Sequence, residues 1–281
     1  MWYQEFDPHP SLAPYIVNFW RIRQSEDCRP LHRERILPDG NPGLMFNWYP
    51  IQRSGMDTAC HMELGRQVWF VGQKNHSVDY QFPEHLPTLT WGVRFHPAGC
   101  RAFSSVAMQE LVDQVVEARE VFGPGVEELI GFDQERLDAS FVVSWLNHYF
   151  LRLLVPYQTP LLVTSSMASV LQRQQVPIHQ LASLHRMSAR QVERYFQGYV
   201  GLSPKRFSTV NRFNRMVCQF DHMNEACLAS LSAEAGYFDT IHMRREIRRI
   251  CGIGVQTLLN HGQDKMRPIL TELIRKRMQW S

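Results

Sequence analysis

Residues 181–204, LASLHRMSARQVERYFQGYVGLSP, return about fifty residues later as residues 231–255, LSAEAGYFDTIHMRREIRRICGIGV. The two copies match at an offset of 50 residues before a central turn and 51 after it. Each copy consists of a short apolar helix pattern, a turn, and a second helix pattern that carries arginines. This organisation predicts two helix-turn-helix units that place their second helices in the major groove of DNA.

In the first copy, Ser188 is the expected N-cap of the second helix, because its hydroxyl can accept from unpaired backbone N–H groups. Arg190, Gln191 and Arg194 then lie on the exposed face of the first two turns. They are the candidate base readers, since arginine reads guanine and glutamine reads adenine. Glu193 either accepts from a cytosine or pairs with an arginine, and the pairing is the favoured alternative.

The helix before this turn is expected to bury Ile178, Leu181 and Leu184 along one face. After the second helix, Ser203 and Pro204 form a typical helix start, an N-cap followed by proline at the first position. The helix that follows is predicted over residues 205–221 and joins the two units. Its candidate phosphate contacts, some of which are expected to be merely solvated, are Lys205, Arg206, Arg212 and Arg215.

In the second copy, Gly236 supplies the positive φ that the turn requires and Asp239 is the expected N-cap. Met243 and Ile247 are expected to be buried. The predicted DNA-facing residues are Thr240, Ile241, His242, Arg244 and Arg245. Arg248 and Arg249 continue the positive charge toward the end of the helix.

The charge of the chain is divided unevenly. Residues 1–164 carry 13 Lys and Arg against 19 Asp and Glu, whereas residues 165–281 carry 17 against 8. The net charges are therefore −6 and +9. A basic second half beside an acidic first half favours a polyanion as the partner of the second half alone.

The six cysteines show no paired spacing, so they are expected to be reduced, buried thiols. The chain start has neither the basic residues nor the apolar run of a signal peptide, and no apolar run approaches 18 residues. We therefore expect a cytoplasmic protein with no membrane partner and no cofactor.

The first hundred residues alternate short β-branched and aromatic runs with turn residues, which predicts a small β-barrel or sandwich. The expected strands are residues 15–22, 33–37, 44–49, 67–71, 77–82 and 89–95. Apolar residues then recur at a spacing of three to four. The helices that this spacing predicts cover residues 101–108, 109–119 and 133–154.

These patterns predict an α+β protein: a β-barrel with accessory helices, followed by an all-α region that holds both helix-turn-helix units. The expected domains are residues 1–155 (β-rich over 1–100, helical over 101–155), a linker over 156–164, a DNA-binding domain over 165–262 and a tail over 263–281. The tail includes a possible amphipathic helix over residues 268–278.

Residues 165–262 resemble the DNA-binding domain of the AraC/XylS-type bacterial transcription regulators. The motifs that carry the resemblance are Leu181-Ala182, Met187-Ser188 through Phe196, Val200-Gly201 through Pro204, Gly236-Tyr237 through Asp239, and His242 through Glu246. The resemblance implies that one monomer presses two recognition helices, bridged by a rigid helix, into successive major grooves.

The sequence departs from that family at several positions. Arg186 stands where a glycine is usual, so a left-handed conformation there costs about 1 kcal/mol. Ser232 replaces an alanine, Met243 and Ile247 replace aromatic residues, and Gly254-Val255 replaces Ser-Pro. These differences predict a more loosely packed second unit, which reads bases or mainly holds phosphates.

Three segments of the first half, residues 10–20, 37–40 and 92–99, are similar to the sensor-like domain that precedes such DNA-binding domains. The similarity implies a cupin-like β-barrel that binds a small-molecule effector or forms a homodimer, with the helices of residues 101–154 as a candidate dimer face. Tryptophans 20, 48, 69 and 91 line a pocket or fill the core. Arg94 binds an acidic ligand or, as we favour, forms an ion pair or lies on an outward face.

The histidines of the first half raise the question of a metal, but their spacing lacks the pattern of metal-binding cupins, and no metal is expected. The residues concerned are His32, Glu34, His61, Glu63, His76, His85 and His96. The sequence therefore favours a sequence-specific transcription regulator that is not an enzyme. Double-stranded DNA is its expected partner, with RNA polymerase as a further candidate, and both activation and repression fit. The alternative is a cupin-type metal or small-molecule enzyme that carries a DNA-binding tail.

Overall fold

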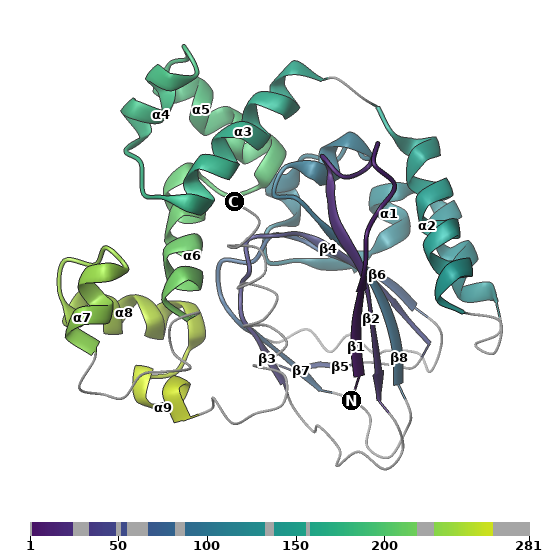
Figure 1. Cartoon of the computed structure of the whole chain (residues 1–281), viewed down its shortest axis with the longest axis horizontal. Helices are drawn as coiled ribbons and strands as arrows, with labels where there is room; N and C mark the ends of the chain where they lie inside the picture. Colours follow the sequence, from purple (N-terminus) through teal and green to yellow (C-terminus); the bar gives the residue numbers. More distant parts are fainter. Residues whose placement is uncertain are drawn as a thin grey trace.

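The computed structural model describes residues 2–24, 34–48, 52–54, 67–81, 88–132, 138–155, 158–217 and 228–260. Strands occupy the first part and helices the second, so the α+β class is confirmed (Figure 1). No helix within these ranges is long and apolar enough to span a membrane. Several sequence predictions lie outside the described residues: those for Cys28, Cys60, Cys218, Cys227, His32, His61, Glu63, His85 and the tail helix over 268–278.

Two antiparallel sheets are formed by the described strands. The larger, of six strands, has the order β1 (Trp2–Phe6), β2 (Ile16–Gln24), β8 (Thr88–Phe95), β4 (Gly43–Asn47), β6 (Gln67–Val71) and β9 (Val115–Glu117). The smaller has the order β3 (Glu34–Ile36), β7 (Val78–Gln81) and β5 (Gln52–Ser54). All six strands expected from the sequence are present, with ends shifted by a few residues. Strands β1, β5 and β9 were not predicted.

The register of the larger sheet separates an apolar face from a polar one. Phe19 pairs with Val93, Val93 with Leu44, and Leu44 with Phe70, so these side chains form one row. All four are buried. The opposite face carries Tyr3, Glu5, Asn18 and Arg94, because successive side chains along a strand point to opposite faces.

Helices cover the apolar face of the larger sheet. They are α1 (Ala118–Phe122), the 3-10 helix η3 (Pro124–Gly131) and α2 (Ala139–Leu153), of which α1 and α2 are seen beside the sheet in Figure 1. Phe122 packs edge-on against Phe70 with ring centroids 5.7 Å apart. Phe150 of α2 lies 5.5 Å from Phe95. Aromatic contacts thus attach the helices to the sheet.

The two helices predicted over residues 101–108 and 109–119 are wrong. The chain there forms only the short 3-10 helices η1 (Gly99–Ala102) and η2 (Met108–Leu111), then strand β9 and the start of α1. Apolar residues of this stretch, such as Phe103, Met108 and Leu111, are buried in the core from short turns and 3-10 helices. Their spacing of three to four residues therefore does not come from an α-helix. The β-branched Val115 and Val116 instead pair with the edge of β6.

The second half contains two helix pairs joined by a long helix (Figure 1). In chain order its elements are α3 (Thr159–Arg173), α4 (Ile178–Leu184), α5 (Ala189–Tyr195), a π-helical turn η5 (Phe196–Val200), α6 (Pro204–Val217), α7 (Leu228–Glu234), α8 (Thr240–Cys251) and α9 (Val255–Asn260). Residues 159–164, which we placed in the linker, therefore belong to α3. Leu161 and Thr164 are fully buried on that helix, and burial of this kind is not expected in a linker.

One hydrophobic core runs from the larger sheet into the first helix-turn-helix unit. It includes Phe95 and Met108 from the first half and Leu161, Phe196 and Val200 from the second. The second unit has a core of its own, with Phe213, Met216, Leu228, Met243 and Ile247 among its members. The first unit is therefore built onto the β-rich region, and the second is attached through α6 and through loops of the first half, one of which adds Leu37 to its core.

Gly201 marks the closest approach between the first unit and the first half. The π-helical turn η5 ends there with a φ of +92°, which residues other than glycine rarely adopt. A Cβ atom at this position would lie 2.7 Å from the Met108 carbonyl oxygen and 2.9 Å from Val112 Cγ2. Both the backbone conformation and the space require glycine.

We predict that Gly201→Ala lowers the free energy of unfolding by about 1–3 kcal/mol, because the new methyl group meets backbone and the positive φ becomes strained. The matched control is Gly198→Ala, whose Cβ would have no neighbour within 4 Å and whose φ is not positive. That control should be neutral or stabilising by up to about 1 kcal/mol. Urea unfolding of both variants checks this, and equal midpoints would contradict it.

Candidate nucleic-acid interface

The first helix-turn-helix unit, α4 and α5, begins its second helix with a complete capping box. The Ser188 hydroxyl accepts from the Gln191 backbone N–H at 3.2 Å, and Gln191 Oε1 accepts from the Ser188 backbone N–H at 2.9 Å. The predicted N-cap is confirmed. Arg186 in the turn has a φ of +53°, so the left-handed conformation expected at this position is present despite the missing glycine.

The outer face of α5 is basic and open to solvent. Arg190, Gln191 and Arg194 are exposed there. Together with Ser188, Glu193 and Gln197 they line a groove of about 400 Å³. Because its side-chain oxygen is already used in the capping box, Gln191 has only its amide N–H donors to offer a base. The two arginines are the stronger base-reading candidates.

One prediction for the first unit is wrong. Leu184, expected to point inward, is 63% exposed, whereas Leu181 and Ala182 are buried. Helix α4 is only seven residues long and ends at Leu184. A helix of two turns buries one narrow face against its partner, and position 184 lies beyond the end of that face.

In the second unit, α7 and α8, the predicted turn glycine, N-cap and buried positions are confirmed. Gly236 has a φ of +77°, and Asp239 Oδ1 accepts from the His242 backbone N–H at 2.6 Å. Met243 and Ile247 are fully buried. The outer face of α8 is formed by the exposed residues Ile241, Arg244, Arg245, Arg248 and Arg249, with Thr240 and His242 half-buried beside them.

We expected Arg212 and Arg215 to contact phosphates, but both side chains bond to other residues of the protein instead. Arg212 Nε donates to Glu246 Oε1 at 3.0 Å, Nη2 contacts Oε2, and the guanidinium lies 4.5 Å from the centre of the Tyr237 ring. Arg215 Nη1 donates to the Gln172 carbonyl oxygen at 3.0 Å, and burial lowers the pKa of its guanidinium. Both arginines join helices. On α6, Lys205 and Arg206 remain exposed.

Helix α6 sets the distance between the two units. The part of it that the structure describes, Pro204–Val217, has 14 residues and is about 21 Å long. Adding about 5 Å at each end for the radius of a packed helix gives a separation of about 30 Å. One turn of DNA advances roughly 34 Å, so the spacing suits successive major grooves.

Two loops of the first half contact the second unit, and no sequence pattern predicted these contacts. In the loop between β6 and β7, the Ser77 N–H donates to the Ile250 carbonyl oxygen at 2.7 Å and the Ser77 hydroxyl donates to the Cys251 carbonyl oxygen at 3.0 Å. After β3, Leu37 joins the apolar core of the second unit. These two loops together, residues 37–41 and 72–77, are named the clasp below.

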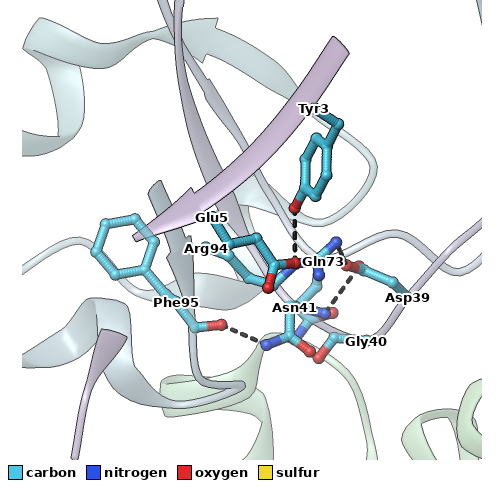
Figure 2. Close-up of polar contacts among 8 residues, drawn as sticks. All are labelled: Tyr3, Glu5, Asp39, Gly40, Asn41, Gln73, Arg94 and Phe95. Carbon is cyan, nitrogen blue, oxygen red and sulfur yellow. Dashed lines mark hydrogen bonds and ion pairs between the residues drawn. The ribbon is translucent and has the colours of Figure 1, made fainter. Parts of the chain in front are cut away.

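The two loops of the clasp contribute to a partly buried polar cluster, shown in Figure 2. Arg94 Nη2 lies 3.0 Å from Asp39 Oδ2, so the ion pair that we favoured for Arg94 is present. Gln73 Nε2 donates to the Gly40 carbonyl oxygen at 2.8 Å, which ties the two loops to each other. The Tyr3 hydroxyl donates to Glu5 Oε1 at 2.8 Å, and burial raises the pKa of Tyr3. Polar groups on one sheet face thus connect to the second unit.

The remaining candidates of the first half have structural positions. Trp48 and Trp91 are buried in the core, while Trp20 and Trp69 are half-buried. His76 lies 3.2 Å from Asp113. Within the described ranges, no group of three or more His, Cys, Asp and Glu side chains could hold a metal ion. Cys100 and Cys251 are both buried, and burial raises the pKa of the Cys100 thiol.

We predict that Arg212→Ala lowers the free energy of unfolding by about 3–5 kcal/mol, because it leaves the Glu246 carboxylate buried without its main partner. Their side chains are only 15% and 6% exposed. Arg249→Ala is the matched control, since Arg249 is 67% exposed and lies 3.8 Å from the same carboxylate. It should change stability by less than about 1 kcal/mol. Thermal unfolding of both variants measures the difference, and a similar loss in both would contradict the assignment.

Comparisons with known proteins describe the two halves differently. Residues 4–117 match the family described as "Domain of unknown function (DUF6597)". No curated protein matches the chain. Solved structures that resemble it include ToxT from Vibrio cholerae, at 7% identity over 86% of this chain and 98% of that one with a TM-score of 0.46. A second is ToxT from Vibrio cholerae O395, at 6% identity over 87% and 97% with a TM-score of 0.46.

A third is unsaturated fatty acid bound ToxT from Vibrio cholerae strain SCE256, at 7% identity over 85% of this chain and 94% of that one with a TM-score of 0.43.

The architecture itself is clear from the chain's own geometry. Two capped helix-turn-helix units follow one another, a 14-residue helix joins them, and a β-rich region precedes them. This is the arrangement that the resemblance of the sequence motifs to the AraC/XylS-type transcription regulators implies.

Proposed function

We propose that this protein is a cytoplasmic, sequence-specific DNA-binding transcription regulator. The observation that carries the proposal is the pair of exposed basic helices, α5 and α8, each started by an N-cap and joined through α6, whose length suits a separation of about one turn of DNA. Each helix lies on a helix-turn-helix support that buries its other side. Two exposed basic helices on such supports are suited to bind in the major groove of DNA.

In the first unit, Arg190 and Arg194 read base edges, since both are exposed on the first two turns of α5 and a guanidinium matches guanine. Ser188 contributes by starting the helix. Lys205 and Arg206 lie exposed at the start of α6 and hold phosphates. Loss of a base-reading arginine should change sequence specificity, whereas loss of a phosphate-binding residue should change affinity for all sequences and its salt dependence.

In the second unit, Arg244 and Arg245 are exposed on α8 beside the half-buried Thr240 and His242. These side chains contact the second major groove, and Asp239 starts the helix that presents them. The basic residues of this unit are as exposed as those of the first. Base reading by both units is therefore part of the proposal.

We also infer that the first half modulates DNA binding through the clasp. The polar cluster of Figure 2 and the second unit share the same two loops, so a change in the cluster moves or frees α8 relative to α5. A small-molecule effector or a second copy of the chain would act by this route. Activation, including contact with RNA polymerase, and repression are both compatible with it.

The direct test is selection of bound sequences from a random duplex library by the full-length protein. We expect two enriched blocks, centred about one helical turn apart. A single block would show that only one unit reads bases. No enrichment at all, with or without added salt, would overturn the DNA-binding proposal.

Arg190→Ala and Arg194→Ala should each lower affinity for the selected site by about 5–150-fold and relax specificity at one base pair. Lys205→Ala should weaken binding to all sequences alike and reduce the salt dependence by about one phosphate contact. Arg152→Ala, an exposed arginine on α2, is the control with the same charge change and should bind as wild type. Fluorescence anisotropy across salt concentrations separates these results, and unchanged binding by Arg190→Ala and Arg194→Ala would refute base reading by α5.

Ser77→Ala tests the clasp. Loss of the hydroxyl removes one hydrogen bond to α8, worth about 1 kcal/mol, so affinity for the two-block site should fall about fivefold. Affinity for a duplex that carries only the first block should stay unchanged. Ser230→Ala is the control, because its hydroxyl donates to Glu234 on the exposed side of α7. Equal effects of Ser77→Ala on both duplexes would contradict the role of the clasp.

A further inference from the structure

The second unit exposes two large apolar side chains beside its basic face. Phe238 is 93% exposed and Ile241 is 65% exposed. They lie three residues apart across the start of α8, on either side of the N-cap Asp239. Other apolar residues of α8, such as Met243 and Ile247, are fully buried. The core of the unit is therefore complete without these two side chains.

The exposure of Phe238 argues against the packing role that its position in the chain would allow. An apolar residue just before the N-cap often packs against the fifth residue after it and fixes the entry of the chain into the helix. Met187 has this position in the first unit, where it packs against the core that contains Val192. The corresponding pair in the second unit is Phe238 and Met243, but Phe238 remains almost fully open to solvent.

The position of Ile241 points to DNA. At the offset of 51 residues that relates the two units after the turn, Ile241 corresponds to Arg190, and Arg245 corresponds to Arg194. One unit thus presents an arginine where the other presents an isoleucine. Both positions are exposed on the first turn of their helices.

We propose that Ile241 and Phe238 read thymines in the second half-site, by apolar contact with the thymine C5-methyl group. In the major groove this methyl group is the one apolar feature that separates thymine from the other three bases. An aliphatic or aromatic side chain recognises it by removing both surfaces from water. The inference rests on the proposed function and adds which chemistry the second unit uses.

The charge around the two side chains selects DNA as the occupant of this surface. Arg244, Arg245, Arg248 and Arg249 are all exposed on the same helix. The central parts of protein–protein interfaces are depleted in charged residues, whereas DNA-facing surfaces are strongly positive. An apolar pair set among arginines therefore fits a groove whose floor offers methyl groups and whose walls are phosphates.

The experiment replaces thymine by deoxyuridine, which removes only the methyl group. Each thymine of the second block in the selected duplex is replaced in turn, and affinity is measured with the full-length protein. We expect a loss of about fourfold for each methyl group that is contacted, from the burial of one carbon. Ile241→Ala and Phe238→Ala should bind more weakly than wild type and should each lose the sensitivity to deoxyuridine at one position.

Leu184→Ala is the matched control, since Leu184 is a 63% exposed leucine outside both recognition helices. It should keep the full sensitivity to deoxyuridine. Because positions 238 and 241 are exposed, their variants should unfold at the wild-type temperature, which is checked alongside. Wild-type protein that binds thymine and deoxyuridine duplexes equally would overturn the inference while leaving the DNA-binding proposal intact, and would direct attention to a protein partner for this surface. Failure to select any site would refute the underlying function instead.

Discussion

The hydrophobic core that passes without interruption from the larger sheet into the first helix-turn-helix unit determines the arrangement of the rest of the molecule. Phe95 on the sheet and Phe196 after α5 belong to the same core, with Met108 and Leu161 among the residues that share it. Close-packed interiors resist relative movement. Helix α5 is therefore held rigidly by the β-rich half, and Gly201 provides the close approach that this packing needs.

The second unit is attached in a different way. It has its own core, the ion pair between Arg212 and Glu246 joins α8 to α6, and the clasp contributes Leu37 and the Ser77 hydrogen bonds. This ion pair, these hydrogen bonds and one apolar side chain are easier to separate than the continuous core that holds the first unit. Regulation of such a molecule would act on the position of α8 while α5 stays fixed. If the proposed function holds, the exposed apolar side chains of α8 give its half-site a chemistry distinct from that of the half-site of α5.

Much of this organisation could be predicted from the sequence, because helix starts and turns obey local rules. Ser188 and Asp239 are N-caps, Gly236 and Arg186 have positive φ, and Met243 and Ile247 are buried, all as expected. The predictions failed where a residue's neighbours come from distant parts of the chain. Residues 109–119 have helical spacing, but Val115–Glu117 within them pair with β6 as strand β9. Leu184, at the end of α4, is exposed instead of buried.

The sequence by itself determined that there are two helix-turn-helix units, where their helices begin, and which side of each helix is basic. These properties depend on residues within four positions of one another. Only the tertiary structure decided that Arg212 is an internal ion-pair partner, that Arg94 pairs with Asp39, and that loops of the first half hold the second unit. The physical reason is that burial and pairing depend on contacts between residues tens to hundreds of positions apart, which periodicity and propensity do not encode.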